Sequence, residues 1–217
     1  MKLELPNISL CIVDTLNYSK CITALRQSMK DINFGEVLIF SDIDYAKHEL
    51  SASSYKFIEI DRLDNTIDYS QYITKQLPKH VNLDYVLIIQ WDGYVIDMMN
   101  WQESFLDYDY IGAEWAPKHW NNYTKNLMGN GGFSLRSKKL MDIVMKDNLI
   151  DIKGNEDAYI CYYYKKYLES YGIKFAPVEI ARQFSFEEIK MDKTFGFHGV
   201  SNLNKIRDSY SKDIEFD

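Results

Sequence analysis

Short apolar runs alternate with amphipathic segments through the first half of the chain. Near-continuous apolar runs predict buried strands at residues 8–13, 36–40 and 85–90, and an alternating run predicts another at 55–60. Apolar positions at helical spacing predict a helix over about residues 19–30. Buried strands that alternate with helices predict an α/β fold with a mostly parallel central sheet covered on both faces.

The later pattern is less regular. A helix at residues 69–77 should stop before Pro78, since the residue ahead of a proline disfavours helix. A short strand at 133–136 and a helix at 137–145 follow a stretch rich in Trp, Asn and Gly. An aromatic-rich helix at 156–171 should end at Gly172 as its C-terminal cap. With no repeat or linker in 217 residues, a single domain over residues 1–217 is the simplest organisation.

The net charge and the cysteines indicate which partners and which cellular compartment to expect. The net charge is −7 and no basic stripe is present, which argues against a nucleic-acid partner. An acidic protein that binds a polyanion needs local help, such as a metal ion or a helix N-terminus. Three cysteines without a Cys-x-x-Cys pair argue against a disulfide or zinc framework. With no leader and no run long enough for a membrane span, the sequence predicts a cytoplasmic protein.

A carboxylate follows the strongest predicted strand, in Gln90-Trp91-Asp92-Gly93. Ligands of open α/β sheets bind beyond the carboxyl ends of the strands. Asp92 could there hold a divalent cation that bridges two phosphates. The alternative is an aspartate that only stabilises a turn.

A glycine-rich run precedes the predicted strand at 133–136. Three of the residues from Gly129 to Gly132 are glycines, which suggests close approach of the backbone to a ligand and the wall of a sugar pocket. A plain turn before the strand is the alternative. The run is not a phosphate-binding P-loop, because no Gly-Lys-Ser/Thr follows it.

Two further segments offer acid–base or metal chemistry. Glu156 and Asp157 open the aromatic helix, where a carboxylate could act as a general base or could simply cap the helix. His198 lies in the run Phe195-Gly196-Phe197-His198-Gly199 and could be a metal ligand or a buried structural histidine. Asp14-Thr15 and Ser41-Asp42 follow the first two strands, where they could hold a base and a ribose or cap the next helix.

Taken in order, these segments resemble the GT-A class of glycosyltransferases. That class combines a Rossmann-like nucleotide half with an Asp-x-Asp metal motif, a glycine-rich loop, an x-Glu-Asp motif and a late histidine. Over roughly residues 5–200 the chain is more closely similar to a group of bacterial glycosyltransferase-like domains found near polysaccharide genes. The segments that carry this closer similarity are QWDG, DYIGAEW, GNGGFSLRS, NED, FAP and FGFHG.

The resemblance implies a GT-A three-layer α/β/α sandwich with a nucleotide-binding half at about residues 1–95 and an acceptor-binding half at about 96–217. It implies an inverting, metal-dependent transfer from a nucleotide-sugar, a UDP-sugar by preference, to a hydroxyl of a glycan or glycolipid acceptor. The implied cofactor is Mn²⁺ or Mg²⁺. The implied role is synthesis of cell-surface polysaccharide or glycoconjugate in the cytoplasm, and peripheral association with the inner face of the membrane stays open.

The same resemblance assigns residue roles. Asp157 would be the catalytic base, and Asp92 and His198 would hold the metal. The donor-binding residues would be Val13, Asp14, Thr15, Asp42, Gln90, Trp91, Gly131 and Gly132. The acceptor-binding residues would be Glu156, Trp115 and Trp120, with Tyr123 as a further stacking residue, although core packing is an alternative for the aromatic ones. Gln90 replaces the first acidic residue of Asp-x-Asp, so metal dependence stays open.

Two other classes of function remain. A nucleotidyltransferase would also use a Rossmann-like sheet and acidic metal ligands, but it would carry a Gly-rich loop with Lys or Arg after the first strand, and Thr15-Leu16-Asn17-Tyr18 is no such loop. A non-catalytic carbohydrate-binding relic of a transferase is the other alternative, which the replacement by Gln90 keeps open.

Overall fold

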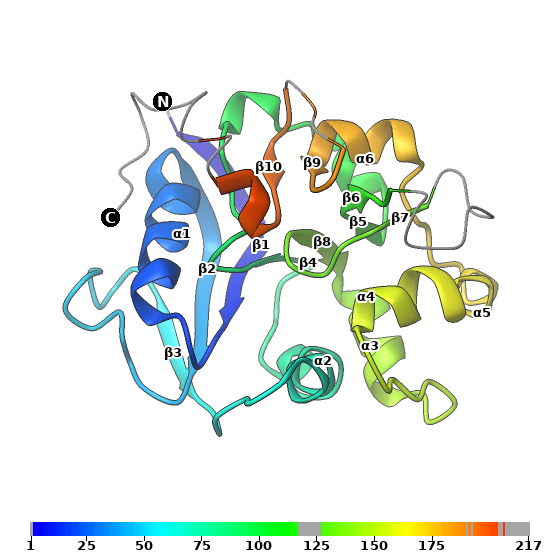
Figure 1. Ribbon diagram of the computed structural model, residues 1–217, viewed down its shortest axis with the longest axis horizontal. Coiled ribbons are helices and arrows are strands. Elements are labelled where there is room, and N and C mark those ends of the chain that lie inside the picture. Colours follow the sequence, from blue (N-terminus) through cyan, green and yellow to red (C-terminus); the bar gives the residue numbers. More distant parts are fainter. Residues whose placement is uncertain (1, 117–126, 190, 192, 204–205, 207–217) are drawn as a thin grey trace.

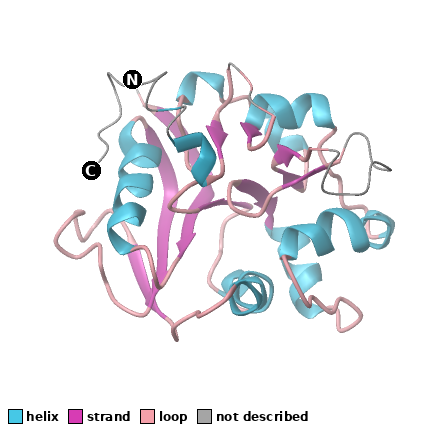
Figure 2. Ribbon diagram, viewed as in Figure 1, coloured by secondary structure: helices cyan, strands magenta, loops and turns pink. Residues whose placement is uncertain are grey.

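The centre of the molecule is a six-stranded sheet of order β3-β2-β1-β4-β8-β5, as the computed structural model shows (Figures 1 and 2). The structure describes residues 2–116, 127–189, 191, 193–203 and 206. The strands are β1 (Leu3–Val13), β2 (Ile32–Ser41), β3 (Lys56–Glu59), β4 (Tyr85–Ile89), β5 (Tyr110–Ile111) and β8 (Ser134–Ser137). The first four are mutually parallel, and β8 runs antiparallel to both β4 and β5. The predicted mixed α/β fold with a mostly parallel sheet is confirmed.

Strand β1 lies in the middle of the parallel part, because β2 pairs with one edge of it and β4 with the other. Leu10 is opposite Val37 on β2 and Leu87 on β4, and these side chains are buried. A strand buried on both faces needs apolar residues at successive positions. This explains why the strands at the sheet centre could be predicted from the sequence.

Helices cover both faces of the sheet and produce three layers. On one face, Leu10 and Ile12 of β1 pack in the same cluster as Cys21 and Leu25 of α1 (Tyr18–Lys30). On the other face, the intervening residues of β1 pack with Ile73 of α2 (Thr66–Lys75) and with α3 (Lys138–Lys146). Figure 1 shows α1 and α2 on opposite sides of the sheet. The layered arrangement follows from the strict alternation of side chains along β1.

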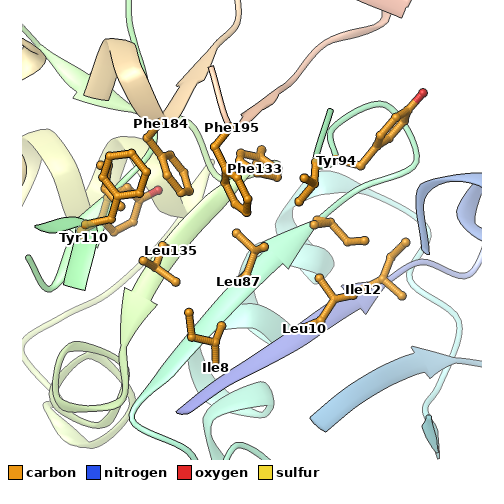
Figure 3. Close-up of a cluster of buried hydrophobic side chains, with 14 of the residues drawn as sticks. Ile8, Leu10, Ile12, Leu87, Tyr94, Tyr110, Phe133, Leu135, Phe184 and Phe195 are labelled. Carbon is orange, nitrogen blue, oxygen red and sulfur yellow. The ribbon is translucent and has the colours of Figure 1, made fainter. Parts of the chain in front are cut away.

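The α1-side cluster extends into the second half of the chain through aromatic rings (Figure 3). The centroid of the Phe133 ring lies 5.1 Å from that of Phe184, which in turn lies 5.9 Å from that of Phe195. Phe184 ends α6 (Val178–Phe184), and Phe195 directly precedes β10 (Gly196–Phe197). These contacts fix the C-terminal segment, which contains His198, against the end of the central sheet.

The helix predicted at residues 156–171 is in fact three segments. They are α4 (Glu156–Ala158), a π-helical turn η5 (Tyr159–Tyr163) and α5 (Lys165–Ser170). The backbone N–H of Tyr164 donates to the carbonyl of Tyr159, so one extra residue is accommodated in the turn. Gly172 has a φ of +74°, as expected for a C-terminal cap.

The helix predicted at 69–77 begins earlier, because Asn65 accepts hydrogen bonds from the backbone of Ile67 and Asp68 and so caps α2. No helix among the described residues is both long enough and apolar enough to cross a membrane. The remaining short elements are η1 (Leu77–Lys79), η2 (Met98–Asn100), η3 (Glu103–Asp107), β6 (Ala113–Glu114), β7 (Met128–Gly129) and β9 (Ser185–Phe186).

Candidate functional site

A cleft of about 410 Å³ opens where β1 and β4 end. Val13 is the last residue of β1, and Gln90 directly follows β4. The cleft therefore lies at the carboxyl ends of parallel strands, where such folds bind their ligands. Its lining residues are Val13, Asp14, Thr15, Leu16, Leu63, Asp64, Asn65, Thr66, Tyr69, Gln90 and Trp91. Five of the eight residues expected at the donor are in this set.

Two donor candidates also have structural partners. Asp14 Oδ1 accepts hydrogen bonds from the backbone N–H groups of Leu16 at 2.6 Å and Asn17 at 2.7 Å, so it stabilises the turn that leads into α1. Thr15 Oγ1 accepts from the backbone N–H of Leu63 at 3.0 Å. Asp42 is not part of the cleft lining, and its Oδ1 accepts from the Tyr18 hydroxyl at 2.9 Å.

Tyr69 is a cleft residue that was not selected from the sequence. It lies on α2, and its hydroxyl is buried without a hydrogen-bond partner among the described residues. A buried hydroxyl that is left unpaired costs free energy. Tyr69 is thus a cleft-lining residue whose hydroxyl is itself buried, beside the side chain of Gln90.

Asp92 and His198 meet at the edge of this cleft. Gln90 and Gly93 exchange two backbone hydrogen bonds, of 2.9 and 3.0 Å, and this tight turn places Asp92 at its tip. His198 Nε2 lies 3.6 Å from Asp92 Oδ1 and 3.0 Å from Gln90 Oε1. The backbone N–H of Gly199 donates to the Asp92 carbonyl at 2.8 Å, which ties the C-terminal segment to this turn. The structure thus brings together the two predicted metal ligands.

Glu187 is a further member of this group, and its Oε1 lies 2.9 Å from His198 Nδ1. Burial by itself would lower the pKa of His198, but the hydrogen bonds and negative charges of Asp92 and Glu187 outweigh it and raise that pKa to about 9. A negative pocket of this kind favours a cation at the position of the imidazole and around it.

The side chains present fit a divalent cation that is shared with a ligand. Among the described residues, no group of three or more His, Cys, Asp or Glu side chains is placed to hold a metal. Asp92, His198 and the amide oxygen of Gln90 nevertheless converge, and Mg²⁺-type sites often take one or two carboxylates and complete their shell with phosphates and water. A metal-binding histidine also keeps a carboxylate on its other nitrogen, as Glu187 is on Nδ1 here.

The glycine-rich loop packs directly against His198. A Cβ atom built on Gly132 would lie 2.1 Å from His198 Nε2, so only glycine permits this approach. Asn130 adopts a φ of 75°, and its Oδ1 accepts hydrogen bonds from the backbone of Gly132 and Phe133. The run is therefore a close-approach wall of the site, held by Asn130 in a left-handed conformation.

Asp157 lies on the other side of the same loop. Its Oδ2 accepts from the backbone N–H of Gly131 at 3.0 Å, and its Oδ1 accepts from that of Ala158 at 2.7 Å. The side chain is half-buried. Burial first, and then the negative charge of Glu156, raises the pKa of Asp157 to about 6. Its carboxylate is thus a stronger base than an exposed aspartate, and it is ionised at neutral pH.

Glu156, the neighbour of Asp157, points into the protein. Its Oε1 accepts from Arg136 Nη2 at 2.8 Å, and its Oε2 accepts from the Ser70 hydroxyl at 3.1 Å. The side chains of Arg136 and Glu156 are only 2% and 4% exposed. An acceptor-binding role for Glu156 stays a prediction. In the structure its side chain contacts Arg136 and Ser70 instead. Arg136 and Ser70 were not selected from the sequence.

Of the three aromatic residues predicted to contact an acceptor sugar, the structure describes Trp115. Trp115 is half-buried and packs on Gly129, where an added Cβ would lie 1.9 Å from its ring. Trp120 and Tyr123 lie outside the described residues. Their proposed contacts with an acceptor sugar stay predictions.

Solved glycosyltransferases share this fold at low sequence identity. An active-site variant of LgtC matches with a TM-score of 0.52 and 11% identity, over 89% of this chain and 87% of that chain. GlyE of Streptococcus pneumoniae TIGR4 matches with a TM-score of 0.49 and 11% identity, over 97% and 60% of the two chains. A mannosyltransferase of Pyrobaculum calidifontis, in complex with GDP-Man and Mn²⁺, matches with a TM-score of 0.45 and 8% identity.

The Pyrobaculum match covers 73% of this chain and 53% of that chain, so this chain spans about half the length of that enzyme. The similarity to LgtC shows the fold alone, and it confirms the predicted GT-A-like architecture.

In sequence, no curated protein matches the chain. The profile of one family does match, over residues 52–198, and that stretch contains the turn at Asp92, the glycine-rich loop, Asp157 and His198. Because the match spans more than half of the chain, the protein belongs to the family described as "Protein of unknown function (DUF5672)".

Proposed function

We propose that this protein is a glycosyltransferase that transfers a sugar from a nucleotide-sugar, a UDP-sugar by preference, to a hydroxyl of a glycan or glycolipid acceptor. The observation that carries the proposal is the convergence of Asp92, Gln90 and His198 at the edge of the cleft beside β1 and β4. The loop at Gly131 and Gly132 separates this group from the carboxylate of Asp157. A cleft, a cation site and a base arranged around one loop match the needs of sugar transfer.

The donor cleft is acidic where a diphosphate must bind. Asp14 and Asp64 line it, and no Lys or Arg does so among the described residues. A Mn²⁺ or Mg²⁺ ion held by Asp92 and His198, with the Gln90 amide oxygen beside them, would supply the positive charge that stabilises the leaving diphosphate. Glu187 keeps the His198 ring oriented through Nδ1.

Asp157 serves as the general base. It takes the proton of the acceptor hydroxyl while the acceptor oxygen forms a bond to the anomeric carbon. The bond between that carbon and the diphosphate oxygen breaks on the opposite face, so the configuration inverts. The raised pKa of Asp157, about 6, increases its affinity for that proton and still leaves it ionised at pH 7.

Two measurements test the proposal. Donor hydrolysis and transfer are followed for the wild type, Asp92→Ala and Asp157→Asn, with circular dichroism to confirm folding. Both substitutions should reduce turnover by about a hundredfold or more, since each removes a group that acts in the transition state. Wild-type turnover in both folded variants would show that the roles assigned here are wrong.

Calorimetric titration of UDP with and without Mn²⁺ separates the proposal from the two alternatives. A glycosyltransferase of this kind should give metal-dependent heat that Asp92→Ala abolishes. A non-catalytic relic should give none, whereas a nucleotidyltransferase should bind a nucleoside triphosphate and release pyrophosphate. The synthesis of cell-surface polysaccharide in the cytoplasm is part of the same proposal and follows from the acceptor class.

A further inference from the structure

A buried ion pair stands directly behind Asp157. Arg136 of β8 and Glu156 of α4 are in contact at 2.8 Å, with side chains 2% and 4% exposed. Removing two charges from water is expensive, and an apolar pair of similar size is often as stable or more stable. Stability alone therefore does not account for a charged pair at these positions.

Two of the three guanidinium nitrogens of Arg136 donate hydrogen bonds to groups in and around the glycine-rich loop. Its Nη2 donates to Glu156 Oε1 and, at 3.4 Å, to the carbonyl of Gly131. Its Nε donates to Ser134 Oγ at 3.0 Å, and its Cζ lies 5.1 Å from the centroid of the Tyr110 ring. One side chain thus binds the loop on which Asp157 rests and the residue that precedes Asp157 in the chain.

Glu156 is held from a second direction by α2. The Ser70 hydroxyl donates to Glu156 Oε2 at 3.1 Å and accepts from the Glu156 backbone N–H at 3.2 Å. Gly131 lies directly against this carboxylate, because a Cβ atom on it would lie 2.3 Å from Glu156 Oε1. The backbone on both sides of the hydrogen bond between Gly131 and Asp157 is therefore fixed by these two charged residues.

We propose that Arg136 and Glu156 are positioning residues for Asp157, which hold its carboxylate against the glycine-rich loop in the orientation that the transfer reaction needs. The inference rests on the proposed function, in which Asp157 is the base. It assigns Glu156 a task inside the protein in place of contact with the acceptor. Neither residue touches the substrate, so each acts through Asp157.

The charges around Asp157 make this arrangement measurable. Glu156 raises the pKa of Asp157 and Arg136 lowers it, while the backbone N–H groups of Ala158 and Gly131 also lower it. Among the described residues, the phenol of Tyr110 and the thiol of Cys161 also interact with it, and burial raises the pKa of both. Both are therefore neutral at pH 7, which leaves Glu156 and Arg136 as the charged neighbours.

Two single substitutions should move the titration of Asp157 in opposite directions. Glu156→Gln removes a negative neighbour and should lower the acidic limb of the pH profile of kcat/KM by about one unit. Arg136→Met removes a positive neighbour and should raise the same limb by a similar amount. A role confined to stability would lower the unfolding temperature of both variants without moving the limb in opposite directions.

Arg136→Lys tests position separately from charge. Lysine keeps the positive charge but lacks the planar fork that reaches Glu156, Gly131 and Ser134 together. We expect the pH limb to stay within about half a unit, while kcat falls about tenfold or more and KM for the donor is unchanged. An unchanged kcat in this folded variant would overturn the proposal.

Arg136→Met leaves a buried Glu156 without its partner and can fail to fold. The double variant Arg136→Met with Glu156→Leu removes both charges and should fold, yet it should still lose kcat about tenfold or more. The control is Arg26→Met with Glu49→Leu, an ion pair of 2.7 Å that is about half exposed and lies far from Asp157 in the chain. A folded double variant with wild-type kcat would contradict the proposal.

Titration of the Asp157 carboxylate by NMR, in protein labelled at aspartate, needs no substrate. Asp157→Asn identifies the resonance. Opposite shifts in Glu156→Gln and Arg136→Met with no turnover of any nucleotide-sugar would support the positioning role and overturn the proposed function. Transfer activity with an Asp157 titration that neither substitution moves would overturn the positioning role and leave the function standing.

Discussion

His198 Nε2 lies 3.6 Å from Asp92 Oδ1, although Asp92 follows β4 and His198 follows the last strand described, β10. The contact is carried by the backbone as well, since the N–H of Gly199 donates to the carbonyl of Asp92. The C-terminal segment thus completes a site that the central sheet only begins. Substitutions at Glu187 and Gly132, which both contact His198, test this contribution of the C-terminal segment.

The first prediction concerns Glu187, which faces His198 Nδ1 at 2.9 Å. Glu187→Gln should weaken metal-dependent binding of UDP by about ten- to a hundredfold, because carboxylates behind metal-binding histidines orient the ring and raise its basicity. Calorimetric titration with Mn²⁺ measures the effect. Glu179→Gln, an exposed carboxylate on α6, is the matched control and should bind like the wild type. Equal affinities for the two variants would remove Glu187 from the site.

A second prediction compares two glycines. Gly132→Ala should abolish UDP binding and lower the unfolding temperature, because the new methyl group would lie 2.1 Å from His198 Nε2. Gly154→Ala should fold and bind normally, since its methyl group would lie 3.4 Å from the nearest neighbouring atom, on Tyr159. Thermal unfolding with and without ligand measures both. Normal binding by Gly132→Ala would mean that the loop does not pack on His198 as described.

The third prediction has opposite signs for stability and binding. Tyr69→Phe removes a buried hydroxyl that has no partner among the described residues, so the free energy of unfolding should stay unchanged or rise by up to about 1 kcal/mol. UDP binding should weaken, because Tyr69 lines the cleft and its hydroxyl lies beside Gln90, another lining residue. Tyr85→Phe is the contrast: its hydroxyl donates to the carbonyl of Leu106, so its loss should destabilise by about 1 kcal/mol. Urea unfolding gives both values.

The fourth prediction concerns pH. With the pKa of Asp157 at about 6, kcat/KM should fall tenfold per unit below that pH, as the base becomes protonated. The pH dependence of the free energy of unfolding has the opposite sign to that of an aspartate in a salt bridge, whose pKa is lowered by folding. The native state keeps this proton to about pH 6, whereas the unfolded chain loses it near pH 4, so the contribution to stability falls as the pH rises between these values.

Asp157→Asn should remove both dependences. The difference in unfolding free energy between wild type and variant, measured from about pH 3 to about pH 7, isolates the contribution of this one carboxylate. A difference that does not change with pH would show that the pKa of Asp157 is not raised by folding.

The sequence predicted the parallel core well, because strands buried on both faces carry apolar residues at successive positions. The runs at 8–13 and 36–40 fall within observed strands, and the run at 85–90 matches β4 except for its last residue. It also predicted the places where Asp92, Asp157 and His198 would be found, since each follows or precedes a recognisable element. The short helix α6 was missed, because two turns give too little periodicity to read.

What the sequence did not reveal are the partners that define each role. Glu187, Arg136, Ser70 and Tyr69 reach the site only through approach of elements that are distant in the chain. No local pattern marks a residue for such a contact. Nor did the sequence distinguish Glu156 from Asp157: two adjacent carboxylates at one helix start look alike until packing turns one inward and leaves the other half-exposed to the loop.

The π-helical turn after Asp157 determines in which direction the side chains of the following helix, α5, point. An α-helix advances about 100° per residue, so one inserted residue rotates the downstream face by about that angle. Leu168 on α5 is fully buried, whereas Tyr163 within the turn is 62% exposed. The extra residue therefore helps to determine which side chains of α5 face the core.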